Sequence, residues 1–268
     1  MTGLSIVIVS FNAKQDLVAC LTSLREAPPR ITHDIFVIDN HSTDGSVECA
    51  RAFPGVRVLA LERNAGFACA NNIGIRQSER ELILLLNSDT LAPPGAIDRL
   101  VERLLATPSA AVAGPRLVDG RGRVERSFGP MISPVNELRQ KVLLALHSRG
   151  FGPAVRRVER DSRHEQFVDW VSGACLLVRR ADAEAAGLLD ERFFMYTEDV
   201  DFCAAIRARG RRVLFTPAAE IVHLRGRSRA AAPTATALAY RRSHLAFYEK
   251  HHPHWVPVLK LYLRLRGA

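Results

Sequence analysis

The sequence predicts an α/β fold built on a mainly parallel central sheet flanked by helices. Short apolar runs alternate with helix-like patterns through the first 118 of 268 residues, and this alternation is typical of right-handed βαβ units. One run, residues 82–86, holds five consecutive large aliphatic side chains, as expected of a parallel strand that is buried on both faces. A chain of this length can bury the core of one large domain.

The apolar runs are the expected strands, and the segments between them are the expected helices. The strands are Leu4–Phe11, Asp34–Asp39, Val56–Leu61, Glu81–Asn87 and Ala111–Val118. The helices are Asp16–Glu26, Gly45–Phe53, Ala68–Ser78 and Gly95–Ala106. Because parallel strands all point the same way, residues that follow different strands should meet at one edge of the sheet.

The middle of the chain is less regular. Residues 120–165 are rich in Gly, Pro and Arg, with one helix-like piece at Val135–His147, and we expect a mobile or partner-dependent insertion there. An ordered block, Phe167 to His223, contains an expected strand, Gly173–Arg179, and an expected helix, Asp199–Arg209. These shifts divide the chain into halves 1–118 and 119–228, followed by a C-terminal helical extension, 229–268.

Positive charge is concentrated near the C-terminus. A helical pattern starts at Thr234 and is expected to break at Pro253 and Pro257. The formal net charge is +9, and the last 48 residues hold nine Lys or Arg and one acid, Glu249. Leu, Trp and Tyr alternate with these basic residues, which suits an anionic membrane surface; a solvated basic face is the alternative. We find no nucleic-acid-binding motif and expect no nucleic-acid partner.

Cysteine usage and hydropathy favour a cytoplasmic protein. The five cysteines are scattered and odd in number, which is typical of small core residues in a reducing compartment. The amino terminus lacks a signal-peptide pattern, and no apolar run approaches the roughly 20 residues of a membrane span. We therefore expect a cytoplasmic location, peripheral on the inner face of the plasma membrane if the basic face binds lipid. A monomer and a homo-oligomer both remain open.

Polar side chains follow three of the expected strands. They are Ser10 and Asn12 after the first, Asp39 at the end of the second, and Asn87, Ser88 and Asp89 after the fourth. A rigidly held acid such as Asp89 is well placed to hold a hard divalent cation; the alternative is a cap on the helix that starts near Pro94. Asp39 can accept the imide N–H of a uracil or thymine base, although turn and cap chemistry explains part of its cluster, Thr43 and Asp44 especially.

Three further clusters have chemistry suited to a nucleotide site. Gly66, after Asn64, allows a ligand to approach the backbone, and the following helix offers its N-terminus to phosphate. Glu198 and Asp199 follow an aromatic run that can raise a carboxylate pKa and create a general base; acids on a helix dipole are the alternative. His223 ends a short apolar run and precedes two arginines, where it is either a metal ligand or structural.

In combination and order, these clusters resemble the inverting glycosyltransferases of family 2, which have a GT-A fold, and especially their bacterial rhamnosyltransferase-like branch. The resemblance runs from about Leu4 to Ser228 and includes Arg241–His252. Its carriers are residues 5–12, 37–40 with Ser42 and Asp44, Asn64 with residues 66–68, Asn71, Gly74, 87–89, 173–174, 193–201, and His223 with Gly226 and Ser228.

The resemblance implies a role for each candidate residue. The donor-binding set is Ser10, Asn12, Asp39, Asn64, Gly66, Asn71, Asn87, Ser88 and Asp89. Asp89 and His223 would hold Mg²⁺ or Mn²⁺, Asp199 would be the general base with Glu198 beside it, and Trp170, Ser172 and Gly173 would contact the acceptor. The donor is expected to be dTDP-L-rhamnose or a UDP-sugar, and the acceptor a saccharide or polyprenyl-linked saccharide of the cell envelope.

The chain departs from the family pattern at two positions. Asn87 stands where the metal-binding DXD element has its first Asp, and Ala205 stands where the helix after Asp199 usually carries an Arg. We expect Arg207 to compensate in part. Two alternatives to a transferase remain: a nucleotide-sugar-binding scaffold or sensor without turnover, and a sugar nucleotidyltransferase, which lacks support because no Gly-rich, Arg-containing loop follows the first strand.

Overall fold

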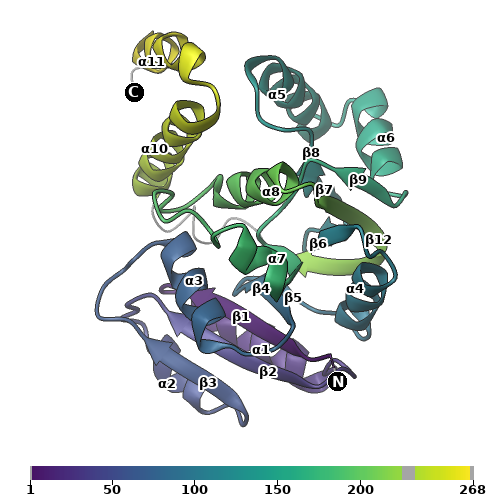
Figure 1. Ribbon diagram of the computed structural model, residues 1–268, viewed down its shortest axis with the longest axis vertical. Coiled ribbons are helices and arrows are strands. Elements are labelled where there is room, and N and C mark those ends of the chain that lie inside the picture. Colours follow the sequence, from purple (N-terminus) through teal and green to yellow (C-terminus); the bar gives the residue numbers. More distant parts are fainter. Residues whose placement is uncertain (1, 225–232, 266–268) are drawn as a thin grey trace.

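One large sheet with helices on both faces forms the body of the protein, as the computed structural model shows for residues 2–224 and 233–265 (Figure 1). Its strand path is β3 (Val56–Ala60), β2 (His33–Asp39), β1 (Leu4–Ser10), β4 (Leu82–Asn87), β11 (Cys175–Arg179), β6 (Ala110–Val118), β12 (Arg212–His223) and β5 (Thr90–Leu91). Two short strands, β7 (Val124–Glu125) and β9 (Gln166–Val168), add to β6 and β12. A separate pair is formed by β8 (Phe128–Gly129) and β10 (Trp170–Val171).

The sheet is mainly parallel, which confirms the prediction. Strands β3, β2, β1 and β4 are parallel neighbours, and β6 is parallel to β12. Strand β11 lies between these two blocks and runs antiparallel to both β4 and β6. Consequently β1, β2, β4, β6 and β12 all point in one direction, and their carboxyl ends lie along the same edge.

Helices cover the two faces in a regular division. One face packs against α1 (Lys14–Glu26), α2 (Ser46–Arg51) and α4 (Ala96–Leu105), and the other against α3 (Phe67–Gln77), α7 (Arg180–Ala185) and α8 (Glu198–Ala208). Strand β4 shows why the sequence requires both layers. Its residues 82, 84 and 86 belong to the first core and 83 and 85 to the second, so an unbroken aliphatic run is needed.

The segment 120–165 contains more structure than predicted. The helix-like piece is confirmed as α5 (Pro134–Ser148), but a second helix, α6 (Gly152–Asp161), follows it. Helix α6 was not predicted because its Gly-Pro start and many arginines are typical of a loop. Pro153 lies in the first helical turn, where a missing N–H removes no helical hydrogen bond.

The C-terminal helical extension is confirmed as α10 (Pro233–His251), a 3₁₀ turn at Pro253–Trp255 and α11 (Val256–Leu265). The predicted break at Pro253 is therefore confirmed. The predicted break at Pro257 was wrong, because Pro257 is the second residue of α11 and a first-turn proline is compatible with a helix. None of the helices described within 2–224 and 233–265 is long and apolar enough to cross a membrane.

Candidate active site

Strands β1 and β2 end in two buried oxygens that have no hydrogen-bond partner among the residues that the structure describes. Ser10 and Asp39 are register partners in neighbouring parallel strands. Asp39 accepts the Ser42 N–H on Oδ2 at 2.8 Å, while its Oδ1 and the Ser10 Oγ are buried with no hydrogen bond. An unsatisfied buried polar atom costs about 1–3 kcal/mol, so these two atoms mark a place where a ligand can donate hydrogen bonds.

Asn12 orders the loop beside this place. Its backbone has a positive φ of 47°, its N–H donates to Ser42 Oγ at 2.9 Å, and its side-chain Oδ1 accepts the Thr43 N–H at 2.8 Å. Asp44 accepts the Lys14 N–H at the start of α1 at 2.9 Å. The cap interpretation of Asp44 is thus confirmed, and Asn12 holds the two loops together.

The loop before α3 packs closely against the backbone of Phe194. Gly66 has a φ of +87°, and a Cβ there would lie 2.6 Å from the Phe194 carbonyl oxygen, so only glycine fits. The Phe67 N–H donates to that same oxygen at 2.6 Å. Asn64 Oδ1 accepts the Gly66 N–H at 3.0 Å, and Asn71 Nδ2 donates to the Phe67 carbonyl at 2.9 Å. This predicted donor loop is therefore fixed to the segment that precedes Glu198.

Asp89 and His223 are neighbours, although 134 positions separate them in the sequence. Strand β5 pairs antiparallel with the end of β12, with Thr90 opposite His223, and His223 Nε2 lies 3.3 Å from Asp89 Oδ1. His223 Nδ1 lies 3.2 Å from Oε2 of Glu125. Burial lowers the pKa of His223, but the hydrogen bonds to Asp89 and Glu125 outweigh it, so the pKa is raised.

The donor set fits a divalent cation. Oxygen and imidazole ligands suit Mn²⁺ and Mg²⁺, and a carboxylate on Nδ1 is the usual support for a histidine that binds metal through Nε2. Glu125 supplies that support and was missed by the sequence analysis. Within 2–224 and 233–265, no group of three or more His, Cys, Asp or Glu side chains is arranged to hold an ion, so further ligands would have to come from substrate or water.

Asp199 is joined by the turn 172–174 to the end of β4, the strand that leads to Asp89. Asp199 Oδ2 accepts the Gly173 N–H at 2.8 Å, and the Ala174 carbonyl accepts the Asn87 N–H at 3.0 Å. A Cβ on Gly173 would lie 3.3 Å from that of Asp199, so the turn and the first residues of α8 are closely packed. Gly173, a predicted acceptor residue, here positions Asp199.

Glu198 is buried beside Asp199. The residue is 5% exposed, and its Oε2 has no hydrogen-bond partner within the described part of the chain. Burial, and then the charge of Asp199, raise the pKa of Glu198 well above its ordinary value, which favours the protonated form. Tyr196 and Thr197, immediately before it, both have positive φ, a conformation that costs free energy for residues other than glycine.

The other two predicted acceptor residues have structural contacts of their own. Trp170 donates its indole N–H to the Pro130 carbonyl at 2.9 Å, and its ring packs between two core clusters. Ser172 donates its backbone N–H to the Ser127 carbonyl at 2.7 Å. Its side-chain oxygen accepts the Ala174 N–H at 3.3 Å. Both residues shape the turn that holds Asp199.

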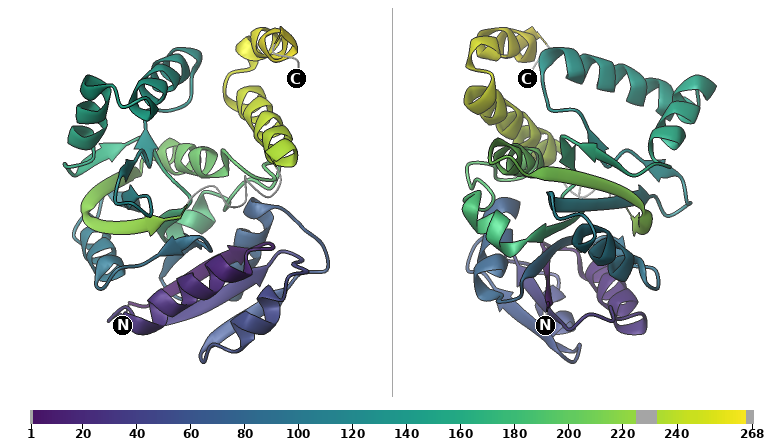
Figure 2. Two further views of the ribbon diagram at one scale, coloured as in Figure 1. Left: turned by 180° about the vertical axis from the view of Figure 1, so that it is seen from behind. Right: turned by 45° about the vertical axis from the view of Figure 1, so that its right-hand side comes forward.

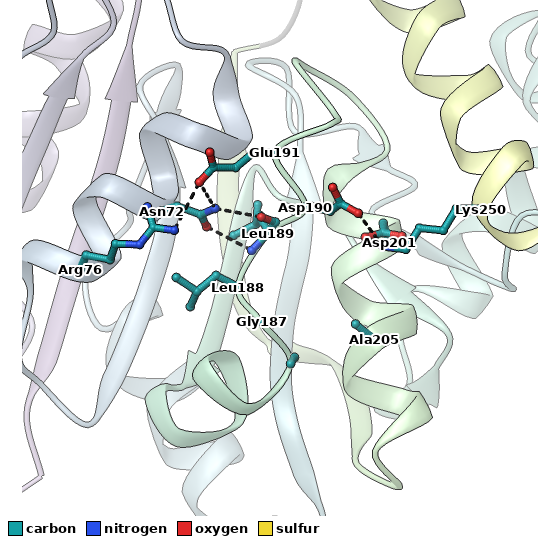
Figure 3. Close-up of a pocket in the computed structure, with 11 residues that line it drawn as sticks. Asn72, Arg76, Gly187, Leu188, Leu189, Asp190, Glu191, Asp201, Ala205 and Lys250 are labelled. Carbon is teal, nitrogen blue, oxygen red and sulfur yellow. Dashed lines mark hydrogen bonds and ion pairs between the residues drawn. The ribbon is translucent and has the colours of Figure 1, made fainter.

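Helix α10 supplies two basic side chains to a buried acid of α8. Asp201 is 1% exposed, and its carboxylate binds Lys250 Nζ at 2.8 Å and His251 Nε2 at 2.6 Å (Figure 3 shows the Lys250 contact). Ala205 lies four residues after Asp201, hence on the same helix face, and lines a cavity of about 350 Å³ with Asp201 and Lys250. Lys250 therefore places its positive charge in the same cavity that Ala205 lines.

Arg207, in the same helix, has a different partner. It forms an ion pair with Asp169 at 2.8 Å. The expectation that Arg207 compensates in part for Ala205 stays a prediction, and the sequence analysis missed Lys250 and His251. None of the predicted donor-binding residues lines the cavity of Figure 3. Arg225, Gly226, Arg227 and Ser228, also singled out in the sequence, lie outside the described residues.

Sequence comparison finds relatives over nearly the whole chain. The family model of Glycosyl transferase family 2 matches residues 5–167. The N-acetylglucosaminyl-diphospho-decaprenol L-rhamnosyltransferase of Mycobacterium tuberculosis is 31% identical over 264 residues, which cover 94% of this chain and 86% of that protein. A low-salt glycan biosynthesis hexosyltransferase of Haloferax volcanii is 26% identical over 211 residues, covering 77% of this chain and 62% of that protein.

Solved structures share the fold at lower identity. A mannosyltransferase from Pyrobaculum calidifontis in complex with GDP-Man and Mn²⁺ has a TM-score of 0.64 at 18% identity, covering 97% of this chain and 68% of the other. GalNAc-T7 with UDP, GalNAc and Mn²⁺ has a TM-score of 0.62 at 17% identity, covering 83% of this chain. The present chain spans only 44% of the length of GalNAc-T7, so the likeness concerns the domain described above.

Proposed function

The chain belongs to glycosyl transferase family 2 and has a GT-A fold, and on this premise we propose that it transfers L-rhamnose from dTDP-rhamnose, with inversion, to a polyprenyl-diphosphate-linked saccharide. A rhamnosyltransferase that is 31% identical over most of both chains supports the sugar and the acceptor class. UDP-sugars are the second choice of donor. The product would be an early unit of a cell-envelope polysaccharide.

A single observation carries the proposal. The turn 172–174 binds Asp199 through Gly173 and binds Asn87 through Ala174. It therefore brings a carboxylate that can act as a base next to the strand end that leads to Asp89. A binding module would need the nucleotide-binding strand ends alone, so the retention of a positioned Asp199 favours turnover.

The nucleotide would lie across the carboxyl ends of β1 and β2. Asp39 Oδ1, which is buried and has no partner among residues 2–224 and 233–265, would accept the imide N–H of thymine or uracil. Asp89 and His223 would hold Mg²⁺ or Mn²⁺, whose charge stabilises the departing diphosphate. Mn²⁺ in two related structures supports a divalent ion without deciding which one.

Asp199 would act on the acceptor. Its carboxylate takes the proton of the acceptor hydroxyl while that oxygen attacks the anomeric carbon from the face opposite the diphosphate. The bond from the anomeric carbon to the diphosphate oxygen breaks, and its electron pair leaves with the nucleotide. One displacement inverts the anomeric centre, and the sugar passes through an oxocarbenium-like state. Protonated Glu198 would limit the negative charge beside Asp199.

The rival without turnover is a nucleotide-sugar scaffold or sensor. Ala205 was the feature that favoured it, because the arginine of the family pattern is missing there. That argument is weakened by Lys250 and His251, which bind Asp201 from α10. The packing around the start of α8 is thus maintained by a different cation.

Calorimetric titration of the purified protein tests the donor site. dTDP-rhamnose, UDP-glucose and UDP-galactose would each be added with and without Mn²⁺ or Mg²⁺. We expect one of them to bind, with an affinity that falls when the metal is removed and when Asp89 is changed to Asn. Glu220→Gln, at a half-buried ion pair with Arg116, is the control. Metal-independent binding in the wild type would contradict the assignment of Asp89 and His223.

A further inference from the structure

Helix α5 exposes an aliphatic stripe. None of its fifteen residues is buried, and Val135, Leu138 and Val142 are the exposed large aliphatic side chains of one face, because residues three and seven positions apart lie on the same side of a helix. Leu138 is 65% exposed. Arg139 and Lys141 flank the stripe. A helix of this kind gains stability when something apolar covers the stripe.

Helix α11 and the turn before it expose a second stripe. Trp255, Val258 and Leu261 are exposed at spacings of three residues, and Leu261 is 58% exposed. The opposite side of α11 is anchored, since Leu259 is buried in a core cluster with Phe247. The exposed stripe is therefore not the side that holds the helix on the protein.

The two helices lie together at one end of the molecule. Lys141 of α5 places Nζ 5.8 Å from the ring centre of Tyr262 of α11. Figures 1 and 2 show α5, α6 and α11 at the same end in every view, opposite the end formed by β2, β3 and α2. We call this surface, made of α5, α6, the turn 253–255 and α11, the helical end face.

Exposed charge on the helical end face is mainly positive. Helix α6 and the residues just after it carry the exposed arginines 156, 157, 160 and 163, and α11 carries Lys260 and Arg264. Glu137, the acid of α5, points inward and binds Tyr248 and His244. Glu159 of α6 lies near Arg163 at 3.9 Å. Arg157 and Arg160 lie near Asp161, and Lys260 lies near Glu249. Basic residues still outnumber acidic ones in α6 and α11, so the two aliphatic stripes are bordered by net positive charge.

We propose that the helical end face docks on an anionic lipid bilayer, with the stripes of α5 and α11 inserted at the level of the acyl chains and the arginines of α6 on the headgroups. Apolar stripes bordered by Lys and Arg are the pattern of interfacial helices, Trp and Tyr favour the membrane–water interface, and anionic headgroups complement the arginines. The proposal extends the proposed function, because a lipid-linked acceptor would be presented at this end of the molecule.

Vesicle co-sedimentation of the full chain tests the proposal without any substrate. The vesicles would contain phosphatidylcholine alone or a mixture of phosphatidylcholine and phosphatidylglycerol. The variants would be Leu138→Glu, Leu261→Glu and a double variant that combines Arg156→Gln and Arg160→Gln. The matched control is Leu105→Glu on α4, because Leu105 is also exposed, at 41%, but lies outside the helical end face. Thermal unfolding would verify that each variant is folded.

We expect each Glu variant to lower the affinity for both kinds of vesicle at least tenfold. The arginine variant should lower affinity only for anionic vesicles, by about fivefold for each charge removed, and the control should bind as the wild type does. Equal binding by the wild type and the variants would overturn the proposal. The proposal would also be overturned if light scattering showed that the wild type is a dimer and that the Glu variants lose the dimer and not vesicle binding. The helical end face would then join two copies of the chain.

The same variants separate this proposal from the proposed function. Donor titration by calorimetry should be unchanged in Leu138→Glu and Leu261→Glu. Vesicle binding as expected, together with a silent donor titration in the wild type, would support the helical end face and count against the transferase assignment. Donor binding by a wild type that does not bind anionic vesicles would support the transferase assignment and count against the helical end face.

Discussion

Residues 1–118 and residues 119–265 hold their candidate site residues in different ways. In the first half, neighbouring loops bind each other: Asn12 binds the Ser42–Thr43 turn, and Asp44 binds the start of α1. In the second half α10 adds anchors from far along the chain: Ser243 donates to the Met195 carbonyl at 2.7 Å, and Lys250 binds Asp201. The segment around Asp199 therefore depends on α10, a helix near the C-terminus.

This difference separates donor binding from catalysis. Changes at Asp39 and the loops beside it should act on nucleotide affinity and leave the chemical step alone. Changes in α10 should loosen the start of α8 and lower turnover, while the nucleotide still binds. The following variants test that separation, from the largest expected effect to the smallest.

Asp199→Asn should have the largest effect, and this effect should be on turnover and not on donor affinity. The amide cannot take the acceptor proton, and loss of a general base costs about 10²–10⁴-fold in rate. Donor affinity should be unchanged, since Asp199 acts on the acceptor. Transfer kinetics and calorimetry on the same preparation measure both quantities. Near-normal turnover would remove Asp199 from the mechanism.

Asp39→Ala should produce the opposite pattern. Loss of a hydrogen bond to the base should raise the dissociation constant of the donor about tenfold to a hundredfold, with little change in turnover at saturating donor. Asp34→Ala is the control in the same strand, because Asp34 binds Arg80 at the other end of β2, at 2.9 Å. If both variants bound donor equally, the base would have to lie elsewhere.

Lys250→Ala should destabilise the second half. Asp201 is buried and would keep only His251, so we expect a loss of about 1–3 kcal/mol in the free energy of unfolding. Arg76→Ala is the matched control: Arg76 pairs with Glu191 in the same cavity lining, but both side chains are largely exposed and the loss should stay below about 1 kcal/mol. Urea unfolding measures both.

Ala205→Arg provides the rescue for that experiment. An arginine at 205 is one turn from Asp201 and can replace the lost ion pair. In the Lys250→Ala background it should restore stability and turnover together. Stability that returns without turnover would show that α10 acts on Asp199 through other contacts, such as Ser243.

Glu137→Gln should have the smallest effect, visible as a pH dependence. Burial raises the pKa of Glu137, but hydrogen bonds from His244 and Tyr248 outweigh it and the pKa is lowered. A lowered carboxyl pKa stabilises the fold above the unfolded value of about 4.3, and this stability is lost as pH falls toward the folded value. The wild type should therefore exceed Glu137→Gln in stability at pH 7, and the difference should shrink below about pH 4. A constant difference would mean that charge is not the cause.

The same contrast explains what the sequence could predict. Ser10, Asp39 and Asp89 follow aliphatic strands, and parallel direction alone brings strand ends to one edge, so local pattern was sufficient. The antiparallel insertion of β11 left that edge unchanged. Glu125 lies 98 positions from His223, and Lys250 lies 49 positions from Asp201. Such partners leave no periodic signal, and the resemblance indicated a missing arginine at 205 without indicating its substitute.

The most direct test of the account is the product of transfer. The wild type and Asp199→Asn would be incubated with dTDP-rhamnose, Mn²⁺ and a polyprenyl-diphosphate-linked N-acetylglucosamine, and the anomeric configuration of the new linkage would be read by NMR. The account predicts a rhamnoside of configuration opposite to the donor from the wild type and none from Asp199→Asn. A product that retains the donor configuration, or equal product from both proteins, would contradict it.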